Sequence, residues 1–289
     1  MERWGHEETV RTQLGPIRCR VAGDGPLLLF VHGALVDGRL WDGVAPLLSD
    51  RFRVACPDLP LGAHREPVPD RARLAAGPIA DALLDLAASL GSREPILVGN
   101  DTGGAIVQVA MSRRPERIGG AVLVSCDAFE NFPPAVFRPV VWLAPRLPVL
   151  LRLFPLLFGT PAMTRKPLPL WLLARRGLPA DLVRSWAEPL RSDPAIREDM
   201  RVLLRGVAPS VTLEAARTFP SFAKPVLVAW ARQDKFFPPA DAERLCRLLP
   251  DATLRWIDDS HTFVPRDRPE ALAAAMGEWL RERFRPGGS

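Results

Sequence analysis

Short, unbroken runs of apolar residues alternate with stretches of helical character along most of this chain. Unbroken apolar runs are typical of strands that are covered on both faces. The runs are Leu27–Val31, Arg53–Cys56, Ile96–Gly99, Ala121–Ser125, Val226–Trp230 and Thr253–Ile257. The stretches that we expect to be helical are Trp41–Leu48, Ile79–Leu90, Gly104–Arg113, Ala240–Leu249 and Pro269–Phe284. Alternating strands and helices predict an α/β protein with a mainly parallel sheet and helices on both faces.

The alternation is interrupted at two places. At the start, Glu8–Leu14 and Ile17–Ala22 predict an antiparallel hairpin joined across Gly15-Pro16. Residues 133–215 hold many prolines and helical patches at Ala180–Leu190 and Asp193–Val207, but no strand-like run. This segment is too long for a loop inside a compact domain. We therefore predict a helical cap at 133–215, inserted into a core that is formed by residues 1–132 and 216–289 and has about eight strands.

Charge and hydropathy exclude two classes of partner. The net charge is +5, but the arginines are spread along the chain without a basic stripe, so we expect no nucleic-acid partner. The most apolar stretch, Val136–Phe158, contains three arginines and four prolines. Burying those arginines in a bilayer is costly, so we reject a spanning helix and expect no membrane partner.

The four isolated cysteines form no C-x-x-C pair, which is typical of reduced thiols in a cytoplasm. The residues after Met1 lack the apolar run of a signal peptide. We therefore expect a cytoplasmic protein. Its expected partner is a small-molecule substrate, without a metal or another cofactor, and we leave open a homodimer.

The most informative motif is G-x-D-x-G at Gly99–Gly103, which follows an apolar run and precedes a helical stretch. A residue on so sharp a strand-to-helix turn has a strained backbone, and its neighbours two positions away must be small. The motif resembles the nucleophile elbow of the α/β-hydrolase superfamily. Asp101 stands at the position where most members carry serine, so the resemblance implies an α/β-hydrolase fold with an aspartate nucleophile.

Other parts of the chain match the same superfamily in order and context. The turn after Phe30-Val31, which reads His32-Gly33-Ala34, is similar to the family's oxyanion turn, and the resemblance implies a hole formed by the backbone N–H groups of Ala34 and Thr102. His261 follows the last expected strand, where the superfamily places its catalytic histidine. The acid that orients it has two candidates, Asp234 and Asp127, of which motif order favours Asp234.

Two other histidines have less specific settings. His32 is expected to be structural rather than a catalytic base. His64 lies on a loop after an expected strand, and we favour a solvated side chain over a contact with substrate.

A carboxylate nucleophile narrows the reaction. Attack on a saturated carbon gives a stable alkyl ester, whereas attack on an ester would give a reactive anhydride. Alkyl halides and epoxides are therefore the expected substrates. The epoxide hydrolases of this fold use two cap tyrosines as proton donors, and this chain has no tyrosine. The resemblance thus favours a haloalkane dehalogenase-like hydrolase, with an epoxide hydrolase that has another proton donor as the alternative.

The halide-binding positions of the dehalogenases are not matched. The residue after the nucleophile is Thr102 rather than Trp or Arg, and Ala34 and Leu35 replace the Asn and Pro of the oxyanion turn. Leu35, Asp127 and Trp142 remain candidates for contacts with the substrate or leaving group, and Trp171 and Trp186 also lie in the expected cap. Two other classes stay open: a cofactor-free lyase or cyclase in which Asp101 and His261 act as acid and base, and a catalytically silent binding module.

Overall fold

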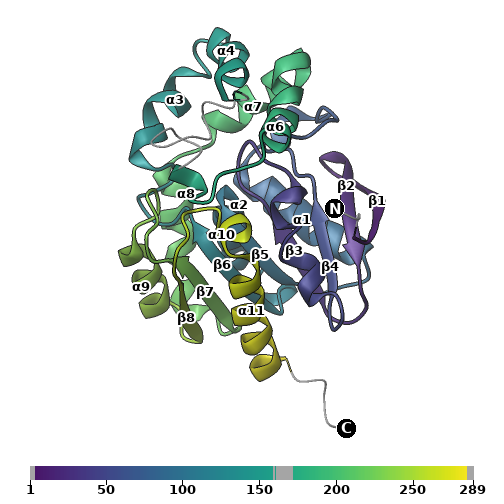
Figure 1. Ribbon diagram of the computed structural model, residues 1–289, viewed down its shortest axis with the longest axis vertical. Coiled ribbons are helices and arrows are strands. Elements are labelled where there is room, and N and C mark those ends of the chain that lie inside the picture. The colour runs from purple at the N-terminus through teal and green to yellow at the C-terminus, as the bar shows by residue number, and fades with distance from the viewer. Residues whose placement is uncertain (1–3, 159, 161–171, 285–289) are drawn as a thin grey trace.

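The computed structural model describes residues 4–158, 160 and 172–284, and eight of its strands form a single sheet (Figure 1). The strand order is β1-β2-β4-β3-β5-β6-β7-β8, and the strands from β3 onward are parallel. Their bounds are β1 His6–Thr12, β2 Gly15–Ala22, β3 Leu27–Val31, β4 Arg53–Pro57, β5 Ile96–Asp101, β6 Gly120–Cys126, β7 Val226–Ala231 and β8 Ala252–Ile257. The predicted α/β-hydrolase architecture, with a mainly parallel sheet of eight strands, is confirmed.

The antiparallel hairpin turns earlier than predicted. Thr12 pairs with Gly15, so the connecting residues are Gln13 and Leu14 rather than Gly15-Pro16. The Thr12 hydroxyl accepts a hydrogen bond from the Leu14 N–H and donates one to the Gly15 carbonyl. These side-chain bonds close the turn before Gly15, which has a φ of +99° that favours glycine.

Two apolar cores lie on the two faces of the sheet. Successive residues of each inner strand point to opposite faces, so Leu29 contributes to one core and Phe30 to the other. One face is covered by α1 (Ala76–Ser89), α2 (Thr102–Arg113), α8 (Pro209–Ala216) and α9 (Pro239–Leu248). The other face is covered by α10 (Val264–Asp267), α11 (Pro269–Arg283) and two short 3₁₀ turns, Gly38–Trp41 and Ala45–Leu48. These turns replace the single helix predicted at Trp41–Leu48, where Gly43 and Pro46 interrupt the helical pattern.

A helical layer between β6 and β7 lies above the carboxyl ends of the parallel strands (Figure 1). It contains α3 (Arg138–Leu143), α4 (Val149–Phe158), α6 (Ala180–Ser192) and α7 (Pro194–Arg205). The last helix before β7, α8, packs instead on α2. Among the described residues no helix is both long and apolar enough to cross a membrane.

Candidate active site

Asp101 lies at the turn between β5 and α2, as the sequence predicts. Its φ of 55° is in the left-handed region that non-glycine residues rarely adopt, so its backbone is strained. The turn needs glycine on both sides: a Cβ on Gly99 would lie 2.7 Å from the Gly103 carbonyl oxygen, and a Cβ on Gly103 would lie 2.3 Å from that of Val31. Gly104 has the same constraint, because its Cβ would collide with Cys126. The close packing around these glycines therefore holds Asp101 in its strained conformation at the edge of the sheet.

Asp101 is half-buried, and its carboxyl group lies against the oxyanion turn. The backbone N–H groups of Ala34 and Thr102 both hydrogen bond to it. Gly33 permits this close approach, since a Cβ at that position would lie only 2.1 Å from Asp101 Oδ2. Burial raises the pKa of Asp101 to about 7, the charge of Asp234 adds to the increase, and the two N–H groups oppose it. These two donors are the ones that the sequence resemblance implied for an oxyanion hole.

Asp127 is the second carboxyl group at this edge. It is 2% exposed, and the Thr102 hydroxyl donates to its Oδ2 at 3.2 Å. Its Oδ1 is buried and has no hydrogen-bond partner in the described part of the chain. Burial raises the pKa of Asp127 well above its usual range, and the charge of Asp101 raises it further. Both causes favour the protonated form of Asp127.

Asp234 is the third buried carboxyl group, and it has more donors than Asp127. Its Oδ1 accepts hydrogen bonds from the N–H groups of Phe236 and Phe237 and from the Thr262 hydroxyl, at 2.8–3.0 Å. Its Oδ2 is buried and has no hydrogen-bond partner among the residues described. Burial raises the pKa of Asp234, and the hydrogen bonds oppose the increase. Of the two predicted acids, Asp234 has the surroundings that better support a negative charge.

The loop that carries His261 is tied to the elbow by Asn100. The Asn100 side-chain amide donates to the carbonyl oxygens of Val124 and Ser125 and, at 2.8 Å, to that of Thr262. The residue before Asp101 is thus bonded to the residue after His261, and this contact brings the two predicted catalytic residues to the same edge of the sheet. His261 itself is only 2% exposed.

Asp267 fixes the same loop from the other side. Its Oδ2 accepts hydrogen bonds from the backbone N–H groups of His261 and Arg175, and its Oδ1 from that of Arg176. Neither Asn100 nor Asp267 was singled out from the sequence. The only available signal was a polar residue within an apolar setting, which does not identify the distant backbone groups that each one binds.

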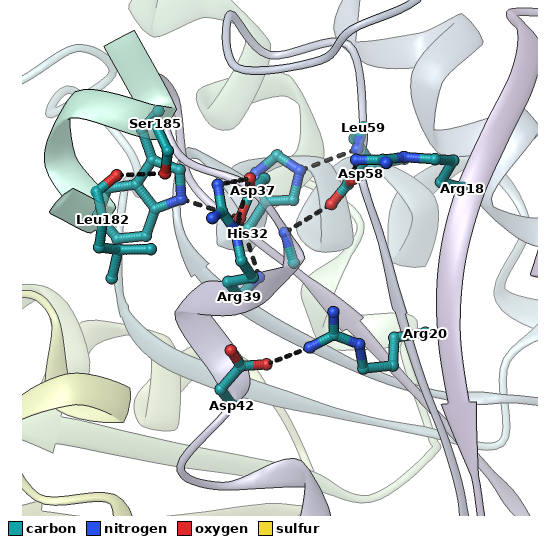
Figure 2. Close-up of polar contacts among 12 residues, drawn as sticks. Arg18, Arg20, His32, Asp37, Arg39, Asp42, Asp58, Leu59, Leu182 and Ser185 are labelled. Carbon is teal, nitrogen blue, oxygen red and sulfur yellow. Dashed lines mark hydrogen bonds and ion pairs between the residues drawn. The ribbon is translucent and has the colours of Figure 1, made fainter. Parts of the chain in front are cut away.

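His32 has a structural role, as predicted. The ring is fully buried, and its Nδ1 lies 2.8 Å from the Gly33 carbonyl oxygen. Its Nε2 accepts from the Leu59 N–H at 2.9 Å (Figure 2). Burial lowers the pKa of His32, so the ring is neutral and donates through Nδ1. Both ring nitrogens are used by backbone groups, and neither is available as a base.

Trp186, from the helical layer, is bonded to the core rather than directed at a ligand. Its ring is buried and its Nε1 donates to Asp37 Oδ1 at 2.8 Å. Asp37 also forms a bidentate ion pair with Arg39, whose closest N–O distance is 2.6 Å (Figure 2). Burial opposes ionisation of Asp37, but Arg39 and Trp186 together lower its pKa. The indole N–H of Trp186 is therefore not available to hold a departing halide.

The sequence expectation that His64 is a solvated loop histidine is wrong. It is 4% exposed, and its Nε2 lies 3.2 Å from Asp199 Oδ2 on α7. Asp199 also accepts from the Val68 N–H and from Arg71 Nε, at 2.8 and 2.5 Å. Burial opposes ionisation of Asp199, but these donors hold its pKa below the usual range. His64 therefore joins the core to the helical layer, through a partner 135 residues away in the chain.

The remaining candidates differ in their surroundings. Leu35 has a φ of 64° and is half-buried beside Gly62, which also neighbours Met200 of α7, so it lies where the core meets the helical layer. Trp142 on α3 is 59% exposed, and Arg146 lies over its ring at 4.3 Å. This arrangement gives no support to a contact between Trp142 and a leaving group. Trp171 lies outside the described residues.

The described part of the chain contains no group of three or more His, Cys, Asp or Glu residues that is arranged to hold a metal ion.

The strained elbow, the buried carboxyl group with two backbone donors and the sheet order together define an enzyme of the α/β-hydrolase fold. The chain belongs to the alpha/beta hydrolase family, whose sequence model matches residues 28–275.

Two relatives and one solved structure extend this result. A Rhodobacter capsulatus protein named magnesium-chelatase 30 kDa subunit is 30% identical over 281 residues, which are 93% of each chain. Haloalkane dehalogenase 2 of Mycobacterium tuberculosis is 26% identical over 275 residues, 89% of this chain and 88% of that protein. The structure of haloalkane dehalogenase DbeA from Bradyrhizobium elkani is similar over 96% of this chain and 98% of that one, with a TM-score of 0.79. At 18% identity, this last likeness is one of fold.

Proposed function

We propose that this enzyme is a hydrolase in which the Asp101 carboxylate attacks a saturated carbon and forms an alkyl-ester intermediate. The observation that carries the proposal is the Asp101 carboxyl group itself, strained at the elbow and bonded by the N–H groups of Ala34 and Thr102. In the proposed reaction one carboxyl oxygen of Asp101 attacks the substrate carbon. A serine hydrolase would need a hydroxyl nucleophile at this position.

Two steps complete the reaction. In the first, an Asp101 oxygen bonds to the substrate carbon, and the leaving group departs with the electron pair of the broken bond. In the second, His261 takes a proton from water, and the resulting hydroxide attacks the carboxyl carbon of the ester. The N–H groups of Ala34 and Thr102 stabilise the negative oxygen that forms. The alcohol then leaves with the proton from His261, and Asp101 keeps one oxygen from water.

Asp234 is the acid that orients His261 in this proposal. A carboxylate must stay charged to stabilise the imidazolium, and the three donors on Oδ1 favour the charged form of Asp234. Asp127 has a single such donor, the Thr102 hydroxyl, and its Oδ1 has no hydrogen-bond partner among the described residues. Burial raises the pKa of Asp127, which favours its protonated form.

We favour an alkyl halide as the substrate class. The likeness to haloalkane dehalogenase 2 over most of both chains supports it, as does the absence of tyrosine as a proton donor for an epoxide. Thr102 does not supply a halide ligand, because its hydroxyl is bonded to Asp127. The helices between β6 and β7 act as the cap that shapes the pocket and supplies the remaining contacts.

Single-turnover labelling in oxygen-18 water tests the nucleophile. Haloalkanes and terminal epoxides are supplied side by side, with halide and diol as readouts. The first-turnover product should contain little label, and the peptide that contains Asp101 should gain it. In the His261→Gln variant the ester should accumulate as a mass increase on that peptide, because only ester hydrolysis needs the base. His6→Gln is the matched control, since its exposed ring pairs with Glu8 far from the elbow.

The opposite result has a definite meaning. Label found wholly in the first-turnover product, with no adduct in the His261→Gln protein, would show that Asp101 is not the nucleophile.

A cofactor-free lyase is the second candidate. The observation that favours it is the pKa of Asp101, raised to about 7, because such a carboxyl group exchanges a proton readily near neutral pH. In that case Asp101 and His261 act as acid and base, and no covalent adduct forms. Neither the haloalkanes nor the terminal epoxides are then turned over.

A further inference from the structure

Most of the large apolar side chains that are strongly exposed in the described part of the chain lie on or beside α3 and α4, on what we call the outer face of α3–α4. Seven of the eight large apolar side chains that are strongly exposed lie here, each 45–62% exposed. They are Val136, Val140, Trp142, Leu147, Val149, Leu153 and Leu156. The eighth, Leu47, lies in a 3₁₀ turn of the core. A patch of this kind marks an interaction surface.

The inner face of the same helices is used in packing. Ala144 and Leu151 are buried, and both helices contact α7. In Figure 1 the two helices form the end of the molecule beyond the carboxyl edge of the sheet, opposite the end of α11. The exposed side chains therefore face outward, away from the cores, and need another apolar partner.

The charges on this face have one sign. Arg138, Arg146 and Arg152 are all exposed, and none of them forms an ion pair with a carboxylate in the described residues. Arg146 lies over the Trp142 ring. Some arginines elsewhere on the surface, such as Arg113 and Arg117, are paired with aspartates.

The sequence extends this contrast. Residues 131–180 contain seven basic and no acidic residues, whereas the rest of the chain has 31 basic and 33 acidic residues. The arginines are spread evenly along the chain, but the acidic residues are not. The net positive charge of the protein therefore comes from this segment.

We propose that the outer face of α3–α4 binds the surface of a membrane that contains anionic lipids. Apolar side chains with a tryptophan among them enter the boundary between headgroups and acyl chains, and arginines reach the phosphates. The helices lie on the surface and do not span it, so the arginines stay in contact with water and headgroups. This proposal replaces the sequence expectation of no membrane partner, which considered only a spanning helix.

A second copy of the chain fits this face less well. In a two-fold dimer the same patch from both chains would meet, bringing six arginines together without an acidic residue from the segment to compensate them. An anionic lipid surface supplies the opposite charge.

Vesicle sedimentation with the full chain and no substrate tests the proposal, so its outcome is independent of the catalytic mechanism. Vesicles of phosphatidylcholine with about a third phosphatidylglycerol should bind the protein, and pure phosphatidylcholine should bind it much more weakly. Arg138→Gln/Arg146→Gln/Arg152→Gln should lower binding by about a hundredfold. The matched control is Arg51→Gln/Arg93→Gln/Arg217→Gln, which removes the same charge from exposed residues that precede β4, β5 and β7. This control should bind as the unaltered chain does.

The apolar contribution has its own pair of variants. Val149→Ser/Leu153→Ser should weaken binding to vesicles about tenfold or more. Leu47→Ser, which replaces an exposed apolar side chain outside the helical layer, should not change it. Equal binding to neutral and anionic vesicles, or equal loss in both arginine triples, would overturn the proposal. So would a concentration-dependent dimer in sedimentation velocity that Val149→Ser/Leu153→Ser abolishes, without any binding to vesicles.

Discussion

The catalytic edge of the sheet and the outer face of α3–α4 depart from the usual distribution of side chains in opposite directions. At the sheet edge three carboxyl groups lie together in a largely apolar setting: Asp127 is buried, and Asp101 and Asp234 are half-buried. On the outer helices seven large apolar side chains are exposed. Both departures reduce the stability of the isolated protein. Each is understandable only if something outside the chain completes it, a substrate at the edge and, as we propose, a lipid surface at the helices.

The largest effect that separates the roles of the buried carboxyl groups should come from Asp234→Asn. If Asp234 orients His261, this variant should slow ester hydrolysis at least about a thousandfold, because the imidazolium loses its counter-charge. Asp127→Asn is the matched variant and should stay within about tenfold, since Asp127 lacks the several donors that favour a charged Asp234. The measurement is rapid-quench separation of ester formation from ester hydrolysis. A larger loss in Asp127→Asn would move the acid to Asp127.

Asp101→Asn should stabilise the fold while it abolishes turnover. Burial raises the pKa of Asp101 from 3.8 to about 7, so the folded protein holds this proton more tightly than the unfolded chain. The stabilisation by the protonated group is fully present below about pH 4 and is lost as the pH rises through about 7. Asparagine cannot ionise, so the free energy of unfolding of the variant should exceed that of the unaltered chain by up to about 4 kcal/mol above pH 7.

Urea unfolding at pH 5 and pH 8 measures this difference. It should be larger at pH 8. Asp258→Asn serves as the control, because Asp258 is 70% exposed on a loop and its replacement should have little effect at either pH. An equal change for Asp101→Asn at both pH values would contradict the raised pKa.

The smallest expected effect is a difference in the free energy of unfolding between variants of the inner and outer surfaces of the helical layer. Trp186→Phe removes the hydrogen bond to buried Asp37 and should lower the free energy of unfolding by about 1–3 kcal/mol. Trp142→Phe changes a ring that is 59% exposed and should change it by less than about 0.5 kcal/mol. Both are measured by chemical unfolding in the absence of lipid. A larger loss in Trp142→Phe would mean that this ring packs on the protein.

The sequence predicted the sheet and the elbow because their requirements are local. An unbroken apolar run indicates a buried strand, and Gly99 and Gly103 are needed at fixed distances from Asp101 whatever the rest of the chain does. The boundaries of the core, 1–132 and 216–289, were inferred from the same alternation and stay a prediction. The 3₁₀ turns at Gly38–Trp41 and Ala45–Leu48 were mistaken for one helix, since their apolar spacing is the same.

The contacts that position the site could not be predicted in this way. His64 was expected in solvent because its partner, Asp199, is 135 residues away and belongs to a helix whose orientation is not encoded locally. Asn100 and Asp267 act on backbone groups, which carry no sequence signal. The exposure of Trp142 depends on how α3 lies on α7, a matter of tertiary packing.

Asp199 has a consequence for how the protein unfolds. This carboxylate on α7 is fully buried, and His64, the Val68 N–H and Arg71, which all belong to the core, donate to it. Replacing Asp199 alone would leave these donors buried without their acceptor, which costs about 1–3 kcal/mol for each buried group. The helical layer and the sheet are therefore coupled in stability through one buried side chain.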